Sequence, residues 1–285
     1  MVLKKILSRF RALIVGEIIS TIKQIHDLQL ISHWEKLKKE ASNPLNRAGE
    51  KYFSQNEEDG ITLEILKRIG LEEGVFAEFG VGNGTENNTL VLLASGWRGF
   101  WVGGESLVIN HRLAPSRFSF IKRWIDRENI LSVLQKGMDT INAKAVDVLS
   151  LDMDGNDIYL VEELLKKKIH PKLFIVEYNA KFPPTINWRI EYDKNHIWGN
   201  DDYFGASLSS FNEVFHKYGY ILICCNFTGA NAFFIKKDLI HFFNDVPRGV
   251  ENLFYKSAYY LFQSFGHKSS AKTIEKILKL DNPEK

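Results

Sequence analysis

The sequence has few of the residues that mark secreted, thiolate-rich or membrane-spanning proteins. Its 285 residues include two cysteines, the neighbours Cys224 and Cys225, which lie in an apolar run. Adjacent cysteines cannot easily bridge each other and have no other partner, so a disulfide framework and a cysteine-based metal site are excluded. No run of about 18 apolar residues occurs, which argues against a transmembrane helix. The net charge of +2 gives no overall signature of nucleic-acid binding.

The composition, 45% hydrophobic and 25% charged, is that of a globular protein, which we expect to be cytoplasmic. The patterning predicts an N-terminal amphipathic helical extension (1–45), a main domain (46–245) and a C-terminal helical segment (246–285). A linker is expected within the turn-forming residues 42–49.

Residues 2–40 carry apolar side chains at three- and four-residue steps, which predicts a helix. Its first turns are basic, with Lys4, Lys5, Arg9 and Arg11. We expect the helix to pack on its own domain or on a second subunit of a homo-oligomer. The alternative is peripheral contact with the inner face of an anionic membrane.

A glycine-rich turn organises the rest of the chain. The run 75–77 predicts a buried strand that ends in Glu78, and Gly80, Gly82 and Gly84 follow at alternate positions. Glycine accepts positive φ and has no Cβ, so this spacing suits a turn where backbone closely approaches a ligand. A helix is predicted next. Strand, glycine turn and helix indicate the start of a doubly wound α/β sheet.

Two further strand ends carry acids suited to a nucleoside. The strand predicted at 99–102 is followed by Glu105, whose carboxylate would accept hydrogen bonds from two vicinal ribose hydroxyls. A strand predicted at 120–125 ends at Asp126, which would meet an adenine amino group. A solvated surface charge is the alternative for Asp126.

Oxygen-bearing side chains gather where two more buried strands, predicted at 146–152 and 172–176, come to an end. They are Asp152, Asp154, Asp157, Glu177 and Asn179. Acids crowded at one strand end are costly unless a cation, hydrogen bonds or solvent relieves them. Asp152, Glu177 and Asn179 therefore form a hypothetical site for Mg²⁺ or another hard divalent cation. The alternative is that these side chains cap helices and bind water.

The long segment 182–203 is rich in aromatic residues, which predicts a functional lid whose rings stack on sugar faces. His196 within it is a candidate general base. Asp154 and Asp157 are further candidates for taking a proton. Helices are expected at 207–218, 253–265 and 271–280, with a strand pair at 220–226 and 232–236.

Several motifs, in matching order over residues 51–240, resemble the FkbM-like group of class I S-adenosylmethionine-dependent methyltransferases. They are SQ with EDG at 54–60, AEFGVGNGTENNT, GW at 96–97, LSLDMDGND, IVEYN and GANAFF. The resemblance implies a Rossmann-like, mostly parallel sheet with an antiparallel last strand. It also implies that Glu78, Gly80, Gly82 and Asn87 hold the cofactor together with Glu105 and Asp126. Relatives often carry a second acid where this chain has Gly103.

The resulting hypothesis is an O-methyltransferase that acts on a sugar hydroxyl of a surface-glycan or polysaccharide precursor, with S-adenosylmethionine as cofactor and a divalent metal as a possible aid. One alternative is a non-catalytic scaffold, docked to a membrane or partner, with a degenerate methyltransferase fold. Another is an NAD-linked sugar enzyme, against which the glycine spacing speaks.

Overall fold

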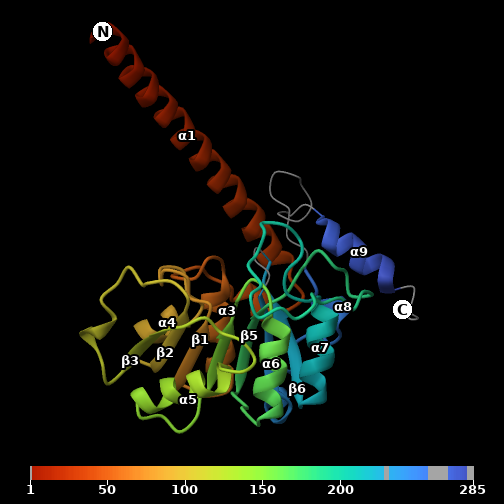
Figure 1. Ribbon diagram of the computed structural model, residues 1–285. Coiled ribbons are helices and arrows are strands. Elements are labelled where there is room, and N and C mark those ends of the chain that lie inside the picture. Colours follow the sequence, from red (N-terminus) through yellow and green to blue (C-terminus); the bar gives the residue numbers. More distant parts are fainter. Residues whose placement is uncertain (1, 228–230, 256–268, 281–285) are drawn as a thin grey trace. The chain divides into compact units, whose positions relative to one another are not determined.

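The computed structural model describes residues 2–227, 231–255 and 269–280, with backbone alone over 2–13 and at 280. The chain divides into two compact units, Met1–Ala41 and Ser42–Lys285. The first contains the helix α1 (Val2–Glu40), which confirms the helix expected over residues 2–40. The second is an α/β domain (Figure 1).

Helix α1 leaves a series of apolar side chains exposed: Ile14, Val15, Ile18, Ile19, Ile22, Ile25, Leu28 and Ile31. Among the helices of the described residues, none combines the length and apolar character needed to span a bilayer. What α1 contacts, whether its own domain, a second subunit or a membrane surface, stays a prediction.

The α/β domain is built on one seven-stranded sheet with strand order β3-β2-β1-β4-β5-β7-β6. The strands are β1 (Val75–Phe79), β2 (Arg98–Gly103), β3 (Phe118–Lys122), β4 (Val148–Leu151), β5 (Leu173–Glu177), β6 (Tyr220–Cys225) and β7 (Asn231–Lys236). Strand β7 runs antiparallel to both of its neighbours, β5 and β6, and the other neighbouring strands of this sheet pair in parallel. The expected Rossmann-like, mostly parallel sheet with an antiparallel last strand is therefore confirmed.

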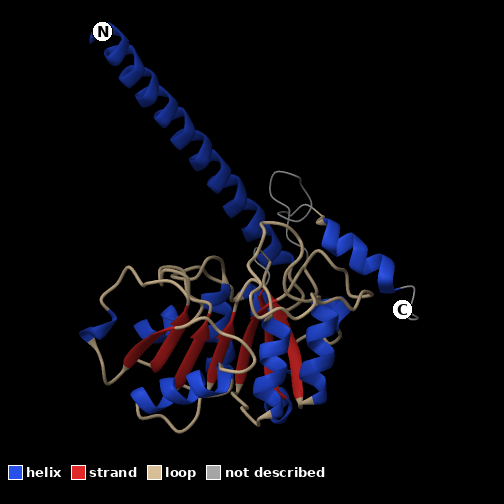
Figure 2. Cartoon of the chain, in the orientation of Figure 1, coloured by secondary structure: helices blue, strands red, loops and turns tan. Residues whose placement is uncertain are grey.

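Helices cover both faces of the sheet (Figure 2). Within the described residues, the helices of this unit are α2 (Pro44–Arg47), α3 (Glu58–Arg68), α4 (Leu90–Ala94), α5 (Ile130–Thr140), α6 (Asp157–Lys166), α7 (Leu208–Lys217), α8 (Val250–Leu253) and α9 (Ala271–Leu280), with 3-10 helices at His111–Leu113 and Lys237–Phe243. Helix α6 contacts both α5 and α7, so these three form one layer. The central strands read as almost continuous apolar runs because both faces of the sheet are covered.

The core is rich in aromatic side chains between the sheet and this helical layer. Phe215 of α7 stacks on Phe234 of β7 with ring centroids 4.0 Å apart, and Phe174 of β5 meets Phe215 edge-on at 5.1 Å. All three rings are fully buried. Burying each contributes about 2–3 kcal/mol relative to exposure. This packing fixes β5 and β7, which both reach the candidate site.

The linker expected at residues 42–49 is instead packed structure. Asn43 caps α2 by accepting a hydrogen bond from Leu45 N, and its own amide donates to Ile223 O of β6 at 2.8 Å. The Asn46 amide donates to Cys225 O, also at 2.8 Å. The turn-forming asparagines therefore satisfy backbone carbonyls at the edge of the sheet, which composition alone does not reveal.

Two other boundaries differ from expectation. Strand β3 ends at Lys122, so Asp126 does not lie at a strand end; the chain leaves the sheet before the apolar pair that was assigned to it. The helix that the apolar pattern of residues 61–69 predicts begins earlier, since α3 starts at Glu58. The helix expected at 271–280 is confirmed, whereas most of the one expected at 253–265 lies outside the described residues. Cys224 and Cys225 are buried in β6.

Candidate functional site

A polar cavity of about 390 Å³ lies at the carboxyl ends of β1, β4 and β5. In a doubly wound sheet this edge is where ligands bind. The glycine turn and the acids after β4 and β5 line the same cavity, although they are far apart in sequence. The lining residues are Gln55, Glu78, Gly80, Val81, Gly82, Asn83, Glu86, Asn87, Asn88, Asp152, Asp154, Glu177, Trp198 and Asn231.

The glycine turn has the backbone shape that the sequence predicted. Gly80, Gly82 and Gly84 all have positive φ, at 88°, 48° and 88°. A Cβ on Gly80 would overlap the carbonyl oxygen of Asp152, whereas a Cβ on Gly82 would meet nothing within 4 Å. Gly80 is therefore needed for the close approach of β1 to the chain after β4. Gly82 keeps open space on the cavity side of the turn.

Glu78 supports this turn through hydrogen bonds to the chain that follows it. One carboxylate oxygen accepts a hydrogen bond from Asn88 N at 2.9 Å, and the other accepts from Thr89 N at 3.0 Å and from Thr89 Oγ1 at 2.5 Å. Burial raises the pKa of Glu78, and the bonds from Thr89 and Asn88 act in the opposite direction. Glu78 thus holds the start of α4 in place while it lines the cavity; its direct role in cofactor binding stays a prediction.

Asn87 offers an unused acceptor to the same cavity. Its side chain is 4% exposed, and its amide nitrogen donates weakly to Val81 O at 3.5 Å. Its Oδ1 is buried and has no hydrogen-bond partner among the described residues. A buried acceptor without a partner is costly, so a ligand donor would be well placed here.

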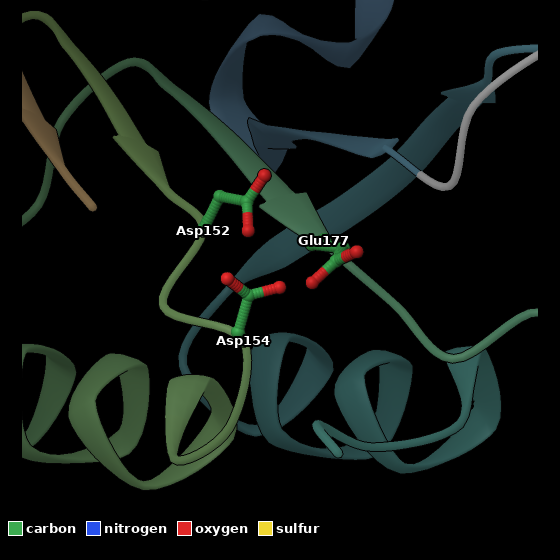
Figure 3. A group of neighbouring side chains, drawn as sticks. All are labelled: Asp152, Asp154 and Glu177. Atoms are coloured by element: carbon green, nitrogen blue, oxygen red, sulfur yellow. The ribbon is translucent and has the colours of Figure 1, made fainter. Parts of the chain in front are cut away.

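Three carboxylates converge on the other side of the cavity (Figure 3). Asp152 and Asp154 follow β4, and Glu177 is the last residue of β5. Each offers an oxygen, and these atoms all lie within 4.8 Å of one another. Asp154 has φ of 52°, a left-handed conformation that aspartate tolerates better than most residues. The tight turn after β4 therefore brings two acids to one point.

The charges at this cluster are not independent. Burial raises the pKa of Asp152 well above its ordinary value, and the nearby charges of Asp154 and Asp157 raise it further. Burial and the charge of Asp152 likewise raise the pKa of Glu177 well above its ordinary value. The two side chains hydrogen-bond to each other. Without a cation, the pair is expected to keep a shared proton, since two adjacent carboxylates cannot easily both ionise.

Asp157 shapes the turn and does not line the cavity. Its two oxygens accept hydrogen bonds from Met153 N at 2.7 Å and Gly155 N at 2.9 Å. Burial raises its pKa to about 6, and these backbone bonds oppose the shift. The structure therefore gives Asp157 a supporting role for the turn that carries Asp152 and Asp154; its role as a general base stays a prediction.

Asn179 and His196 lie outside the set that lines the cavity. The Asn179 amide donates to Asp202 O at 3.0 Å and Phe204 O at 3.1 Å, and its Oδ1 accepts from Lys181 N. His196 lines a separate cavity with Asp193, Tyr203 and Lys272, and burial lowers its pKa. These contacts do not favour the metal-ligand role predicted for Asn179 or the base role predicted for His196.

The two acids expected to hold the nucleoside also lie apart from the cavity lining. Glu105 is exposed in the loop after β2. Asp126 accepts hydrogen bonds from Glu128 N and Asn129 N, both at 2.9 Å, and so supports the chain that enters α5. Their cofactor roles stay predictions that no contact in this structure supports.

The aromatic lid is largely an inward-facing cluster. Trp188 is 1% exposed and stacks on Phe182 with ring centroids 4.3 Å apart, which rules out a sugar platform at that position. Trp198 differs, because it lines the cavity while its indole nitrogen donates to Asp201 O at 2.8 Å. Of the aromatic residues predicted for stacking, Trp198 is the one that the geometry supports.

Asp202 connects this loop to α9. Its buried carboxylate accepts hydrogen bonds from Ser270 N at 2.8 Å and Thr273 Oγ1 at 2.7 Å, and it pairs with Lys181 at 2.5 Å. Burial alone would raise its pKa, but Lys181 and these donors together hold the pKa below its ordinary value.

We expect Asp202→Asn to loosen α9 from the loop, since an amide satisfies fewer of these donors and leaves Lys181 without its charge partner. A local cost of about 2 kcal/mol is expected. Because the folded-state pKa is depressed, this contribution is present above the ordinary aspartate pKa and is lost as pH falls through the folded value. Hydrogen exchange of the α9 amides at neutral pH measures it. Unchanged α9 protection would contradict the prediction.

Comparisons with known proteins place few limits on function. No family model and no curated protein matches the chain. Among solved structures, a match is found to the MycE methyltransferase from the mycinamycin biosynthetic pathway in complex with Mg, SAH and mycinamycin VI. The chains are 12% identical over 61% of this chain and 45% of that one, with TM-score 0.32. A TehB-like SAM-dependent methyltransferase from Corynebacterium glutamicum is 13% identical over 75% and 100%, with TM-score 0.34.

A putative hemolysin from Streptococcus thermophilus is 15% identical over 67% of this chain and 70% of that one, with TM-score 0.39. For MycE, an O-methyltransferase from Planctomyces limnophilus and CalO1, the chain spans 45%, 51% and 54% of their length, about half in each case. Likeness at this level carries no argument about activity. The functional argument therefore rests on the cavity itself.

Sequence reasoning gave no role to Asn231 or Gln55, both of which line the cavity. The strand pair predicted at 220–226 and 232–236 left Asn231 outside both strands, but β7 begins at Asn231 itself. The available signal was a polar residue directly before the strand predicted at 232–236.

Proposed function

We propose that this chain is an S-adenosylmethionine-dependent O-methyltransferase that acts on a sugar hydroxyl of a surface-glycan precursor with the help of a divalent cation. One observation carries the proposal: the glycine turn after β1 and the carboxylates after β4 and β5 line a single cavity. A methyl donor held at the turn would lie beside groups able to accept a proton or hold a cation.

The turn suits the methionine part of this cofactor, which supplies an electrophilic methyl group on a sulfonium. Gly82 has no side chain to occupy the open space, and Gly80 permits the close approach of β1 to β4. The buried Oδ1 of Asn87 lacks a partner among the described residues and would accept from the ammonium group of the ligand. These features fit a zwitterionic ligand at the turn.

The acids account for the proton of the acceptor. As the acceptor oxygen bonds to the methyl carbon, the carbon–sulfur bond breaks and its electron pair stays on sulfur. The hydroxyl proton then passes to a carboxylate, for which Asp152, Asp154 and Glu177 are in place. Holding the acceptor oxygen in line with the methyl group contributes most of the rate, and proton removal contributes a further 10²–10⁴-fold or so.

The same three acids fit a hard divalent cation. Their oxygens lie within 4.8 Å of one another, and oxygen ligands are those that Mg²⁺ prefers. Such an ion would lower the pKa of an acceptor hydroxyl. Asp152, Asp154 and Glu177 would hold it, and its positive charge would offset the repulsion among their carboxylates.

Trp198 supports a sugar as the acceptor. It lines the same cavity as Asp152, Asp154 and Glu177, and an indole face packs well on the apolar face of a sugar ring. The surface-glycan pathway itself is supported by the FkbM-like sequence motifs.

Isothermal titration of the full chain with S-adenosylmethionine and S-adenosylhomocysteine tests the proposal, with Mg²⁺ or EDTA present. We expect micromolar binding, about −8 kcal/mol. NAD is the control ligand and should not bind. A Mg²⁺ titration of the complex, followed by a screen of nucleotide sugars for methyl transfer, tests the finer steps. No binding of either ligand at millimolar concentration would contradict the enzyme and favour a scaffold.

A further inference from the structure

Asn231 lies on the cavity wall directly opposite an acid of the cluster. It is the first residue of β7, and the antiparallel register pairs it with Glu177 at the end of β5. Residues directly opposite each other in adjacent strands have Cβ atoms about 5 Å apart on the same face of the sheet. Both residues line the cavity. The side chain of Asn231 therefore extends beside the carboxylates.

Glu58 fixes which end of the Asn231 amide is available. Asn231 Nδ2 donates to Glu58 Oε1 at 2.9 Å, and a carboxylate accepts but does not donate. The amide nitrogen must therefore face Glu58, and Oδ1 must face the other way. The backbone N–H of Asn231 donates to Asn226 Oδ1 at 2.9 Å, which further restrains the residue.

The oxygen left over has no use within the described protein. Asn231 is 8% exposed, and its Oδ1 has no hydrogen-bond partner among the described residues. Leaving such an acceptor buried costs about 1–3 kcal/mol. Glu58 holds the amide so that its oxygen stays without a partner beside a group of acids. This arrangement points to an electron-poor ligand, such as a cation, bound to that oxygen.

We propose that Asn231 Oδ1 is a neutral fourth oxygen ligand of a divalent cation held by Asp152, Asp154 and Glu177. This inference deepens the proposed function, on whose cation site it rests. Carboxylates combined with an amide oxygen are a donor set suited to Mg²⁺, Mn²⁺ or Ca²⁺. The contribution of Asn231 comes from β7, so the antiparallel strand completes a site that the parallel strands β4 and β5 begin.

Glu58 is then a positioning residue behind this ligand. It is fully buried, and its oxygens also accept from Asn226 Nδ2 at 2.6 Å and from Asn56 N at 2.9 Å. Three donors from separate segments fix the carboxylate, which in turn fixes the orientation of the Asn231 amide. Partners of this kind behind a metal ligand commonly change affinity by about 10–100-fold when they are replaced.

The test is Mn²⁺ binding to the full chain, followed by electron paramagnetic resonance of the free ion, together with calorimetry of S-adenosylhomocysteine on the same samples. We expect Asn231→Leu, which keeps the branching at Cγ and removes the oxygen, to weaken Mn²⁺ binding at least about tenfold. Glu58→Gln should weaken it in the same direction. Cys225→Ala is the matched control, since it perturbs packing on the neighbouring β6 without touching a polar group of the cavity.

Separate outcomes decide the two proposals. Mn²⁺ affinity lowered in Asn231→Leu but kept in Cys225→Ala, with S-adenosylhomocysteine binding retained by both, supports Asn231 as a ligand. Equal Mn²⁺ affinity in the wild type and Asn231→Leu overturns the inference. So does a wild type that binds S-adenosylhomocysteine but no Mn²⁺, and in that case the methyltransferase proposal stands without its cation. Thermal unfolding of each variant shows that it is folded.

Discussion

Gly80→Ala is expected to destabilise the fold strongly, whereas Gly82→Ala, two residues away, should leave the fold intact and weaken ligand binding. Both glycines have positive φ, so both substitutions carry the cost of a left-handed conformation, about 1–2 kcal/mol. The difference lies in the space around each. A Cβ on Gly80 would overlap the Asp152 carbonyl, while one on Gly82 would meet no atom within 4 Å.

The overlap at Gly80 cannot be relieved by turning a side chain, because the obstructing atom belongs to the backbone after β4. Strands β1 and β4 are hydrogen-bonded neighbours in the centre of the sheet, and Asp152 N donates to Phe79 O at 3.1 Å. Moving them apart breaks this pairing. We therefore expect a loss of more than about 4 kcal/mol for Gly80→Ala, which is exceptional for one methyl group.

Urea unfolding of both variants measures the difference. Gly82→Ala should lose only about 1–2 kcal/mol of unfolding free energy. Its new methyl group points into open space at the turn, so S-adenosylhomocysteine affinity should fall about tenfold, or about 1.4 kcal/mol. Similar stabilities for the two variants would show that the turn is not as tightly held as the structure implies.

The parts of the fold set by local pattern were predictable from the sequence. Buried apolar runs located the strands, and the rule that parallel strands end at one edge placed Asp152 and Glu177 together. The same rule failed for Asp126, since an apolar run of this length does not by itself show where the chain leaves the sheet; β3 ends at Lys122.

Side chains whose partners are remote in sequence were not predictable in this way. Asn179 follows β5 at a position where a metal ligand was expected. Its amide nitrogen instead donates hydrogen bonds to Asp202 O and Phe204 O. Asn231 lies next to Glu177 only because of the antiparallel register between β5 and β7. Both outcomes depend on long-range pairing, about which neither composition nor periodicity carries information.

Glu177→Gln is expected to make the protein more stable at neutral pH while it removes most of the activity. Burial and Asp152 raise the pKa of Glu177, so the folded protein binds a proton there more tightly than the unfolded chain does. Stability from this group is therefore present at low pH and falls as pH rises from the ordinary glutamate value toward the raised one. Glutamine cannot ionise, so it avoids this loss.

Unfolding free energy measured by urea at a series of pH values tests the sign. The wild type should lose stability as pH increases above about 4.5, and Glu177→Gln should show a flatter profile with a gain of about 1 kcal/mol at neutral pH. Divalent cations should restore stability to the wild type and not to the variant. Glu128→Gln, at an exposed acid outside the cavity, is the control and should change neither profile nor activity.

The activity of Glu177→Gln should fall by about 10²–10⁴-fold in methyl transfer, because a neutral amide neither accepts the hydroxyl proton nor holds a cation as a carboxylate does. S-adenosylhomocysteine binding should change little, because the turn proposed to hold it follows β1 and does not include Glu177. The substitution is thus expected to raise stability and lower activity, as at a residue whose buried charge serves function at a cost in stability. A variant that is less stable than the wild type at pH 8, or equally active, would contradict the assignment of Glu177 to the site.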